Sequence, residues 1–241
     1  MAGPVKTEGI VLRSMRYGEA DRILHLYTPM RGKIGAIAKG VRRTKSRFGG
    51  RLEPFFHLNL ILHEGRSDLL TVTSAETVAA HARLRVDGPA LDAAARACDA
   101  VSRLFDTHEP NPAVFHLLAT ELGLMDADRA RHATHANQLA FRLKLLLAAG
   151  LAPQLAACAS CGEHDHLVAF SGAHGGVVCA GCEAGAFPFD AAAHAFMTAA
   201  LGSPLAEGPA GVARTLAQVE RAVRETVDHH GAGRLRAGTP R

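Results

Sequence analysis

The feature that most limits the fold of this chain is a change of hydrophobic period near residue 80. Before that point, short runs alternate between apolar and polar side chains with the period of half-buried strands. Beyond it, apolar side chains recur at about 3.6 residues, as in amphipathic helices. We therefore expect an α+β, multidomain chain with strands first and helices later. The strand-like runs are residues 8–15, 21–27, 33–39, 54–63 and 69–74.

Turn residues separate these five runs. Tyr17-Gly-Glu19 follows the first run, residues 28–32 follow the second, and residues 64–68 precede the last. Glycine, proline and aspartate favour turns, so the runs read as short strands joined by tight connections. Five short strands within 80 residues are typical of a small closed barrel. We predict a five-stranded barrel of the oligonucleotide/oligosaccharide-binding (OB) type over residues 1–80.

The remaining chain predicts helices with a small module inserted among them. Helices are expected after Pro89, after Pro112, over about residues 132–149, and near residues 190–200 and 212–227. Cys98 lies within the first apolar stripe and is expected to be a small buried side chain. We predict a helical domain over residues 81–241, with a zinc ribbon at about residues 154–188.

Four cysteines form two C-x-x-C pairs that are separated by 17 residues. This spacing is typical of a four-thiolate zinc site, in which each pair supplies two sulfurs from one tight turn. Glycines beside the pairs, Gly162 and Gly181, would ease those turns. Four thiolates leave no open position for a water, so we predict one structural Zn²⁺. The predicted ligands are Cys158, Cys161, Cys179 and Cys182.

Other chemistries have less support in the sequence. His164, His166 and His174 lie between the cysteine pairs and are alternative ligands, although the spacing does not require them. The H-x-E signature of zinc deaminases is absent, and two pairs at metal spacing disfavour thiol–disulfide exchange. Phosphate-binding and dinucleotide-binding glycine motifs and the G-x-S-x-G motif are also absent. We therefore expect a binding protein and not an enzyme.

Positive charge is concentrated in the first third of the chain. Residues 1–80 carry 13 basic and 7 acidic side chains, whereas residues 81–241 carry 14 and 16. Residues 31–51 hold eight basic side chains and no acidic one. A strand that leads into a glycine-bounded basic loop suits contact with a phosphate backbone. The predicted DNA-binding residues are Arg13, Arg16, Lys33, Lys39, Arg42, Arg43, Lys45, Arg47 and Arg51.

Aromatic side chains are scarce, which affects the expected mode of binding. Barrels that bind single strands combine a basic groove with aromatic stacking platforms. The chain has no Trp and two Tyr, and the first third offers Tyr17, Tyr27, Phe48, Phe55 and Phe56. We expect phosphate electrostatics to dominate, with weak sequence preference and strong salt dependence. The alternative interpretation of the charge is an ordinary solvated basic surface.

No apolar run approaches the ~18 residues that a membrane span needs. The first residues show no basic-then-apolar leader. We therefore expect reduced cysteines in a cytoplasmic protein.

Several stretches resemble the RecO family of DNA repair proteins. They are residues 8–13, 17–22, 32–43 and 52–55, then 143–162, 175–179 and the tail from His229 through Arg236. The resemblance covers nearly the whole chain and implies an OB barrel, a helical domain and an inserted zinc ribbon. It also implies a nucleoid-associated recombination mediator that binds single- and double-stranded DNA and anneals complementary strands. With its partner RecR, such a protein helps to load RecA onto single strands that are coated by single-stranded DNA-binding protein (SSB).

Two other interpretations stay open. The chain suits an RNA-binding or ribosome-associated protein with an OB barrel and a zinc ribbon. It also suits a scaffold whose barrel binds protein, with its basic face docking an acidic peptide such as the acidic tail of SSB. The pocket for such a peptide is expected among the helices. The basic, glycine-rich tail after His229 is expected to add at most a weak phosphate contact.

Overall fold

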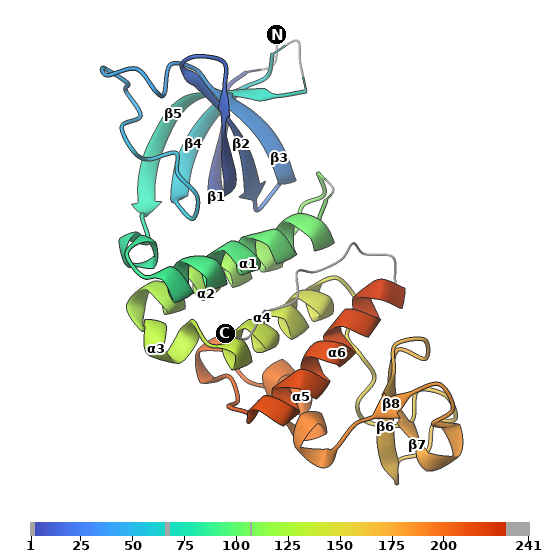
Figure 1. Cartoon of the computed structure of the whole chain (residues 1–241). Helices are drawn as coiled ribbons and strands as arrows, with labels where there is room; N and C mark the ends of the chain where they lie inside the picture. Colours follow the sequence, from blue (N-terminus) through green and yellow to red (C-terminus); the bar gives the residue numbers. More distant parts are fainter. Residues whose placement is uncertain (1–2, 66–67, 107, 230–241) are drawn as a thin grey trace. The chain divides into compact units, whose positions relative to one another are not determined.

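A computed structural model describes residues 3–65, 68–106 and 108–229 of the chain (Figure 1). The predicted contribution of the basic tail falls largely on residues 230–241, outside the described residues. The chain divides into two compact units, Met1–Ala127 and Asp128–Arg241. The first unit thus includes two helices as well as the barrel, and the predicted domain boundary near residue 80 stays a prediction. Within the described residues, no helix is both long and apolar enough to cross a membrane.

The first unit contains a closed five-stranded barrel, which confirms the predicted OB-type fold. The strand order is β1-β2-β3-β5-β4, with β1 pairing antiparallel to both β2 and β4. β3 and β5 are parallel neighbours. The strands are β1 (Val5–Tyr17), β2 (Asp21–Thr28), β3 (Gly32–Ala38), β4 (His57–His63) and β5 (Leu70–Ala79).

The alternating pattern determines which side chains fill the barrel. In β3, Ile34, Ala36 and Ala38 are buried while Lys33 and Ile37 lie on the outer face. Leucines of β2 and β4 complete the interior. Burying one such side chain stabilises the fold by about 1.5–3 kcal/mol. The barrel core therefore follows directly from the period of two.

The fourth strand begins at His57 and not at Pro54 as predicted. Phe55 has φ of 73°, a left-handed conformation that interrupts a strand. Its amide donates to the carbonyl of Val11, and the amide of Val11 donates to the carbonyl of Phe56. Both phenylalanines are buried. This segment therefore closes the barrel over a bulge in β1 before β4 begins.

Three helical segments follow the barrel in the first unit: η1 (Ala82–Arg85), α1 (Gly88–Leu104) and α2 (Pro112–Ala127). The carboxylate of Asp87 accepts the Ala90 amide at 3.0 Å, which caps α1. Cys98 is buried as predicted, and burial raises the pKa of its thiol to about 12. Leu91 of α1 is exposed, whereas alanines of the same helix pack inward.

The second unit combines helices with a three-stranded ribbon sheet of order β7-β6-β8. The predicted helix at residues 132–149 is divided, because Thr134 caps a new helix through the Asn137 amide. Asp190 caps α5, because its carboxylate accepts the Ala193 amide. β8 was not predicted, because a strand of two residues is too short to show a hydrophobic period. The helices are α3 (Arg129–His132), α4 (His135–Ala148), α5 (Ala191–Gly202), η3 (Leu205–Glu207) and α6 (Ala213–His229); the ribbon has β6 (Leu167–Ser171), β7 (Gly176–Cys179), η2 (Ala180–Cys182) and β8 (Phe187–Pro188).

Candidate nucleic-acid interface and metal centre

The basic loop, residues 39–51, connects β3 to the segment before β4 and is folded by successive turns. The amide of Arg43 donates to the Gly40 carbonyl, and the amide of Ser46 donates to the Arg43 carbonyl. Phe48 and Leu52 are inserted into the barrel core, with exposed fractions of 2% and 1%. The loop backbone is therefore fastened to the barrel while its cationic side chains remain outside.

The start of the loop lies against the β1–β2 hairpin. The Gly40 amide donates to Asp21 Oδ1 at 2.8 Å, and the Arg42 amide donates to the Ala20 carbonyl at 2.9 Å. Arg42 Nη1 also lies 3.5 Å from the carbonyl oxygen of Gly18. These contacts bring the loop beside Arg16, which precedes the hairpin turn in β1.

Eight of the nine predicted DNA-binding side chains are exposed. Besides Arg42, two of them have contacts within the protein: the Arg47 guanidinium lies 4.9 Å from the centroid of the Phe48 ring, and Arg51 Nη1 donates to the Ala75 carbonyl at 3.0 Å. We call these eight side chains the cationic set: Arg13, Arg16, Lys39, Arg42, Arg43, Lys45, Arg47 and Arg51.

Lys33 differs from the cationic set because the protein itself holds its ammonium group. Lys33 Nζ lies 2.5 Å from Asp106 Oδ1 and donates to the Ser102 carbonyl at 3.0 Å. This places a cation at the C-terminal end of α1, where the helix dipole favours positive charge. The hydrogen bond from Lys33 lowers the pKa of Asp106. No sequence pattern indicates this pair, because 73 residues separate its members.

The four predicted metal ligands lie together in the ribbon. Their sulfur atoms are all within 4.8 Å of one another, and the Sγ atoms of Cys161 and Cys179 are 3.7 Å apart. A tetrahedral zinc with Zn–S bonds of about 2.3 Å requires sulfurs about 3.8 Å apart. Burial raises the pKa of the Cys158 thiol, but hydrogen bonds from the backbone of Cys161, Cys179 and Ser160 lower it to about 6. The separations of the four sulfur atoms therefore fit a tetrahedral Zn²⁺ site.

The two metal-binding turns differ in what they require of their glycines. Gly162 has φ of 83° and its amide donates to the Cys158 carbonyl, so the first turn needs glycine. Gly181 does not have a positive φ, and a Cβ there would approach Cys179 Sγ only to 3.9 Å. The second turn instead forms the short helix η2. The expected conformational role of Gly181 is therefore wrong.

Two contacts with other segments of the second unit position the ribbon. Gly176 pairs with Gln154, and a Cβ at Gly176 would lie 2.2 Å from the Gln154 carbonyl oxygen. The Arg221 guanidinium of α6 stacks 4.1 Å from the Phe187 ring centroid.

Two histidines near the cysteines form contacts with other groups: His164 Nδ1 lies 3.2 Å from the Ala156 oxygen, and His174 Nδ1 lies 3.0 Å from Ser171 Oγ. Among the described residues, the cluster contains cysteines alone.

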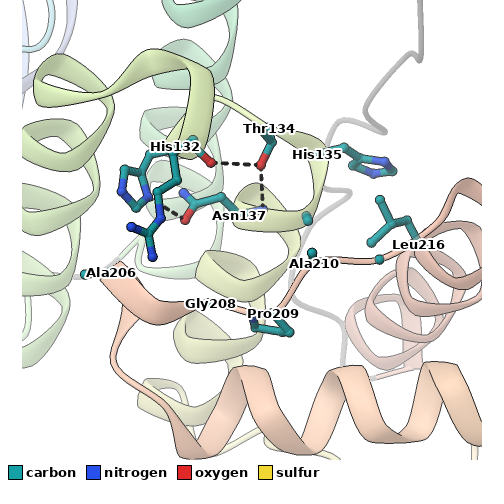
Figure 2. Close-up of a pocket in the computed structure, with 12 residues that line it drawn as sticks. His132, Thr134, His135, Asn137, Ala206, Gly208, Pro209, Ala210 and Leu216 are labelled. Carbon is teal, nitrogen blue, oxygen red and sulfur yellow. Dashed lines mark hydrogen bonds between the residues drawn. The ribbon is translucent and has the colours of Figure 1, made fainter.

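A pocket of about 500 Å³ lies in the second unit, at the start of α4 (Figure 2). Thr134 Oγ1 accepts the Asn137 amide and donates to the Arg131 carbonyl, which fixes the α3–α4 turn. The opposite wall is the segment of residues 206–211, with Leu216 of α6. The pocket therefore combines basic side chains on one side with apolar ones on the other. Its side chains include Arg131, His132, His135, Ala206, Pro209 and Leu216.

These features define a class of proteins. In this class an OB-type barrel with a cationic loop precedes a helical region that carries a four-cysteine ribbon. Two sequence models cover most of this chain. The model described as Recombination protein O N terminal matches residues 1–81, and Recombination protein O C terminal matches residues 85–238. The chain belongs to the RecO family, which confirms the resemblance found in its sequence.

Curated relatives agree with this membership. A DNA repair protein RecO from Anaeromyxobacter dehalogenans (strain 2CP-C) is 38% identical over 97% of this chain and 94% of its own length. The RecO protein from Anaeromyxobacter sp. (strain Fw109-5) is 36% identical over 98% of this chain and 95% of its own. The one from Bifidobacterium adolescentis is 44% identical over 72% of this chain and 71% of its own. Family membership supports a role in DNA repair and recombination.

Proposed function

We propose that this protein is a recombination mediator that binds single- and double-stranded DNA and anneals complementary strands. With RecR, it assists RecA loading onto DNA coated by SSB. It acts at DNA in the nucleoid and performs no covalent chemistry of its own. Family membership supports this role, and the observation that carries the DNA-binding part is the cationic set around the basic loop.

The arrangement of the loop supports phosphate binding for two reasons. Its cations are exposed while hydrophobic contacts hold its backbone, so little order must be gained on binding. Side chains from the β1 strand and the loop also lie near each other, because the loop bonds to the β1–β2 hairpin. Such a surface releases counterions from a nucleic-acid backbone and depends strongly on salt.

The DNA-binding proposal is tested by replacing Arg42, Arg43 and Lys45 together with Ala. Each lost phosphate contact should reduce the slope of log affinity against log salt by about 0.7 on single strands. The triple variant should therefore bind oligonucleotides more weakly and show a slope smaller by about 2. A control that replaces Lys6, Arg214 and Arg224 with Ala removes the same charge outside the loop. An equal slope for both triple variants would refute the assignment.

Strand annealing tests the mediator role directly. Complementary oligonucleotides coated with SSB should anneal faster with the wild-type protein than with the loop variant. Competition between RNA and single-stranded DNA of equal length separates this role from an RNA-binding one. Preference for RNA together with failure to anneal coated DNA would overturn the proposal.

For the SSB partner, we propose that the pocket at the start of α4 receives an acidic peptide that ends in apolar residues. Arg131, which lines the pocket, would face the carboxylates. Pro209 and Leu216, which Figure 2 labels, would contact the apolar side chains. An acidic-tail peptide should give binding heat in calorimetry with the wild type. Arg131→Ala should reduce the affinity by roughly 10- to 150-fold, as expected for a lost charge-assisted hydrogen bond. Absence of heat with the wild type would count against this site.

A further inference from the structure

The β1–β2 hairpin ends in an exposed aromatic ring that the cationic set does not include. Tyr17 is the last residue of β1, opposite Asp21, and its exposed fraction is 53%. Gly18 follows it with φ of 53°, and a Cβ there would meet no atom within 4 Å. The ring therefore stands at an open turn where a flat ligand has room to approach.

Tyr17 differs from the other aromatic side chains that the sequence offered in the barrel. Tyr27, Phe48, Phe55 and Phe56 have exposed fractions between 1% and 7%, and all belong to the core. Of these five rings, only Tyr17 is accessible to a ligand. Aromatic rings on single-strand-binding barrels contribute by stacking with unpaired bases.

The charges around the ring favour a base over a phosphate at this point. Arg42 contacts the Gly18 carbonyl, so a cation of the basic loop lies on one side of this turn. Glu19 on the same turn is exposed and adds a negative charge that repels phosphate. A neutral base is not repelled by this carboxylate. The hairpin tip thus suits the base, and the loop beside it suits the backbone of the same strand.

We propose that Tyr17 stacks with an unpaired base of a DNA single strand whose phosphates lie on the basic loop. This inference rests on the proposed DNA-binding function and adds a residue that distinguishes single strands from duplexes. Bases within a duplex are already stacked on one another, so they gain nothing from the ring. Tyr17 therefore contributes to single-strand affinity alone, and its contribution does not depend on salt.

The composition of the chain provides a direct readout of this contact. The protein has no Trp and two Tyr, and the second, Tyr27, is 1% exposed in the core. Stacking on a base quenches tyrosine emission, so titration with oligothymidine should quench the wild-type signal. Tyr17→Phe should keep the single-strand affinity, because the ring remains, and should lose the quenching. Quenching that persists in Tyr17→Phe would overturn the proposal.

Removal of the ring tests the energetic contribution. Tyr17→Ala should weaken binding of oligothymidine by roughly 5- to 100-fold while duplex affinity and the salt slope stay unchanged. Val78→Ala, which shortens another exposed side chain of the barrel, should change neither affinity. An equal loss on single strands and duplexes, or no loss at all, would refute the stacking role. If the wild type bound no oligonucleotide even at low salt, the proposed function would fail together with the inference.

Discussion

Lys33 lies on the outer face of β3 and Lys39 directly follows the strand, and the two side chains have different surroundings. Lys39 is exposed at the start of the basic loop, whereas the Lys33 ammonium is held by Asp106 and the Ser102 carbonyl. The alternation of the strand predicted the outward direction of both side chains. It did not distinguish them, because the partners of Lys33 come from the end of a helix far along the chain.

The two lysines should therefore respond differently to replacement. Lys33→Ala should lower the free energy of unfolding by up to about 1 kcal/mol, since it breaks an ion pair whose carboxylate is largely exposed. Lys39→Ala should leave stability unchanged and weaken DNA binding. Denaturant melts and salt titrations of both variants measure the two effects. A Lys33→Ala variant of wild-type stability with a reduced salt slope would contradict this division.

His81 makes the first unit sensitive to acid. It is nearly buried, and burial lowers its pKa below 6.5; His57 and Arg85 lower it further, while Asp126 raises it. The unfolded chain therefore binds the proton more readily than the folded protein. This contribution to stability is complete above pH 6.5 and is lost as the pH falls below that value.

We expect the free energy of unfolding to decline less between pH 7 and pH 5 in His81→Asn than in the wild type. Asn suits this position because His81 has φ of 44°, which Asn tolerates. Denaturant melts at several pH values provide the measurement, with exposed His116→Asn as the control. Parallel pH profiles for His81→Asn and the wild type would show that His81 is not responsible.

At the scale of the elements, the ribbon depends on its metal turns and on one close backbone contact. Ala169 and Val178 form a small cluster with the cysteines, whereas Phe170 and Phe187 pack with Phe189. The side of the sheet that carries the cysteines therefore has few apolar contacts of its own, so binding of Zn²⁺ would supply folding free energy there. The cysteine spacing predicted the ligands, but the contact between Gly176 and Gln154 had no sequence signal.

Removal of the metal should unfold the ribbon and spare the barrel. We expect about one zinc per chain in the purified protein, and a strong chelator should abolish cooperative unfolding of the second unit. Elemental analysis and calorimetric melts measure both effects. DNA affinity should remain, because the cationic set lies in the other unit. Protein purified without zinc that melts cooperatively would contradict the structural role of the metal.

Gly176→Ala tests the contact of the ribbon with the preceding segment. A Cβ at this position would lie 2.2 Å from a backbone oxygen, so the strand must move. We expect a loss of about 1–3 kcal/mol in stability and weaker zinc retention, as for an overpacked site. Gly181→Ala is the matched control, since its Cβ would meet Cys179 Sγ at 3.9 Å. Equal stability of the two variants would show that the ribbon tolerates the shift.

At the scale of the whole molecule, patterns of short range predicted most of the architecture. A period of two identified all five barrel strands, and the cysteine pairs identified the ribbon. The features that were missed depend on distant residues or on single backbone angles. Phe55 shortens β4 through a positive φ, and the pocket joins Arg131 to Leu216 across most of the second unit. A local hydrophobic period does not predict such long-range contacts.

The insertion of Phe48 and Leu52 into the barrel affects how the loop would bind a nucleic-acid strand and which of its residues can be replaced. Because both side chains are buried in the barrel, the segment that carries them has already lost much of its conformational entropy during folding. A nucleic-acid strand that binds there would therefore cause a smaller further loss of entropy. Association there should be fast and nearly rigid, with little change in heat capacity. Phe48, Leu52 and the positive-φ Gly49 between them should therefore be the positions of this segment that tolerate replacement least.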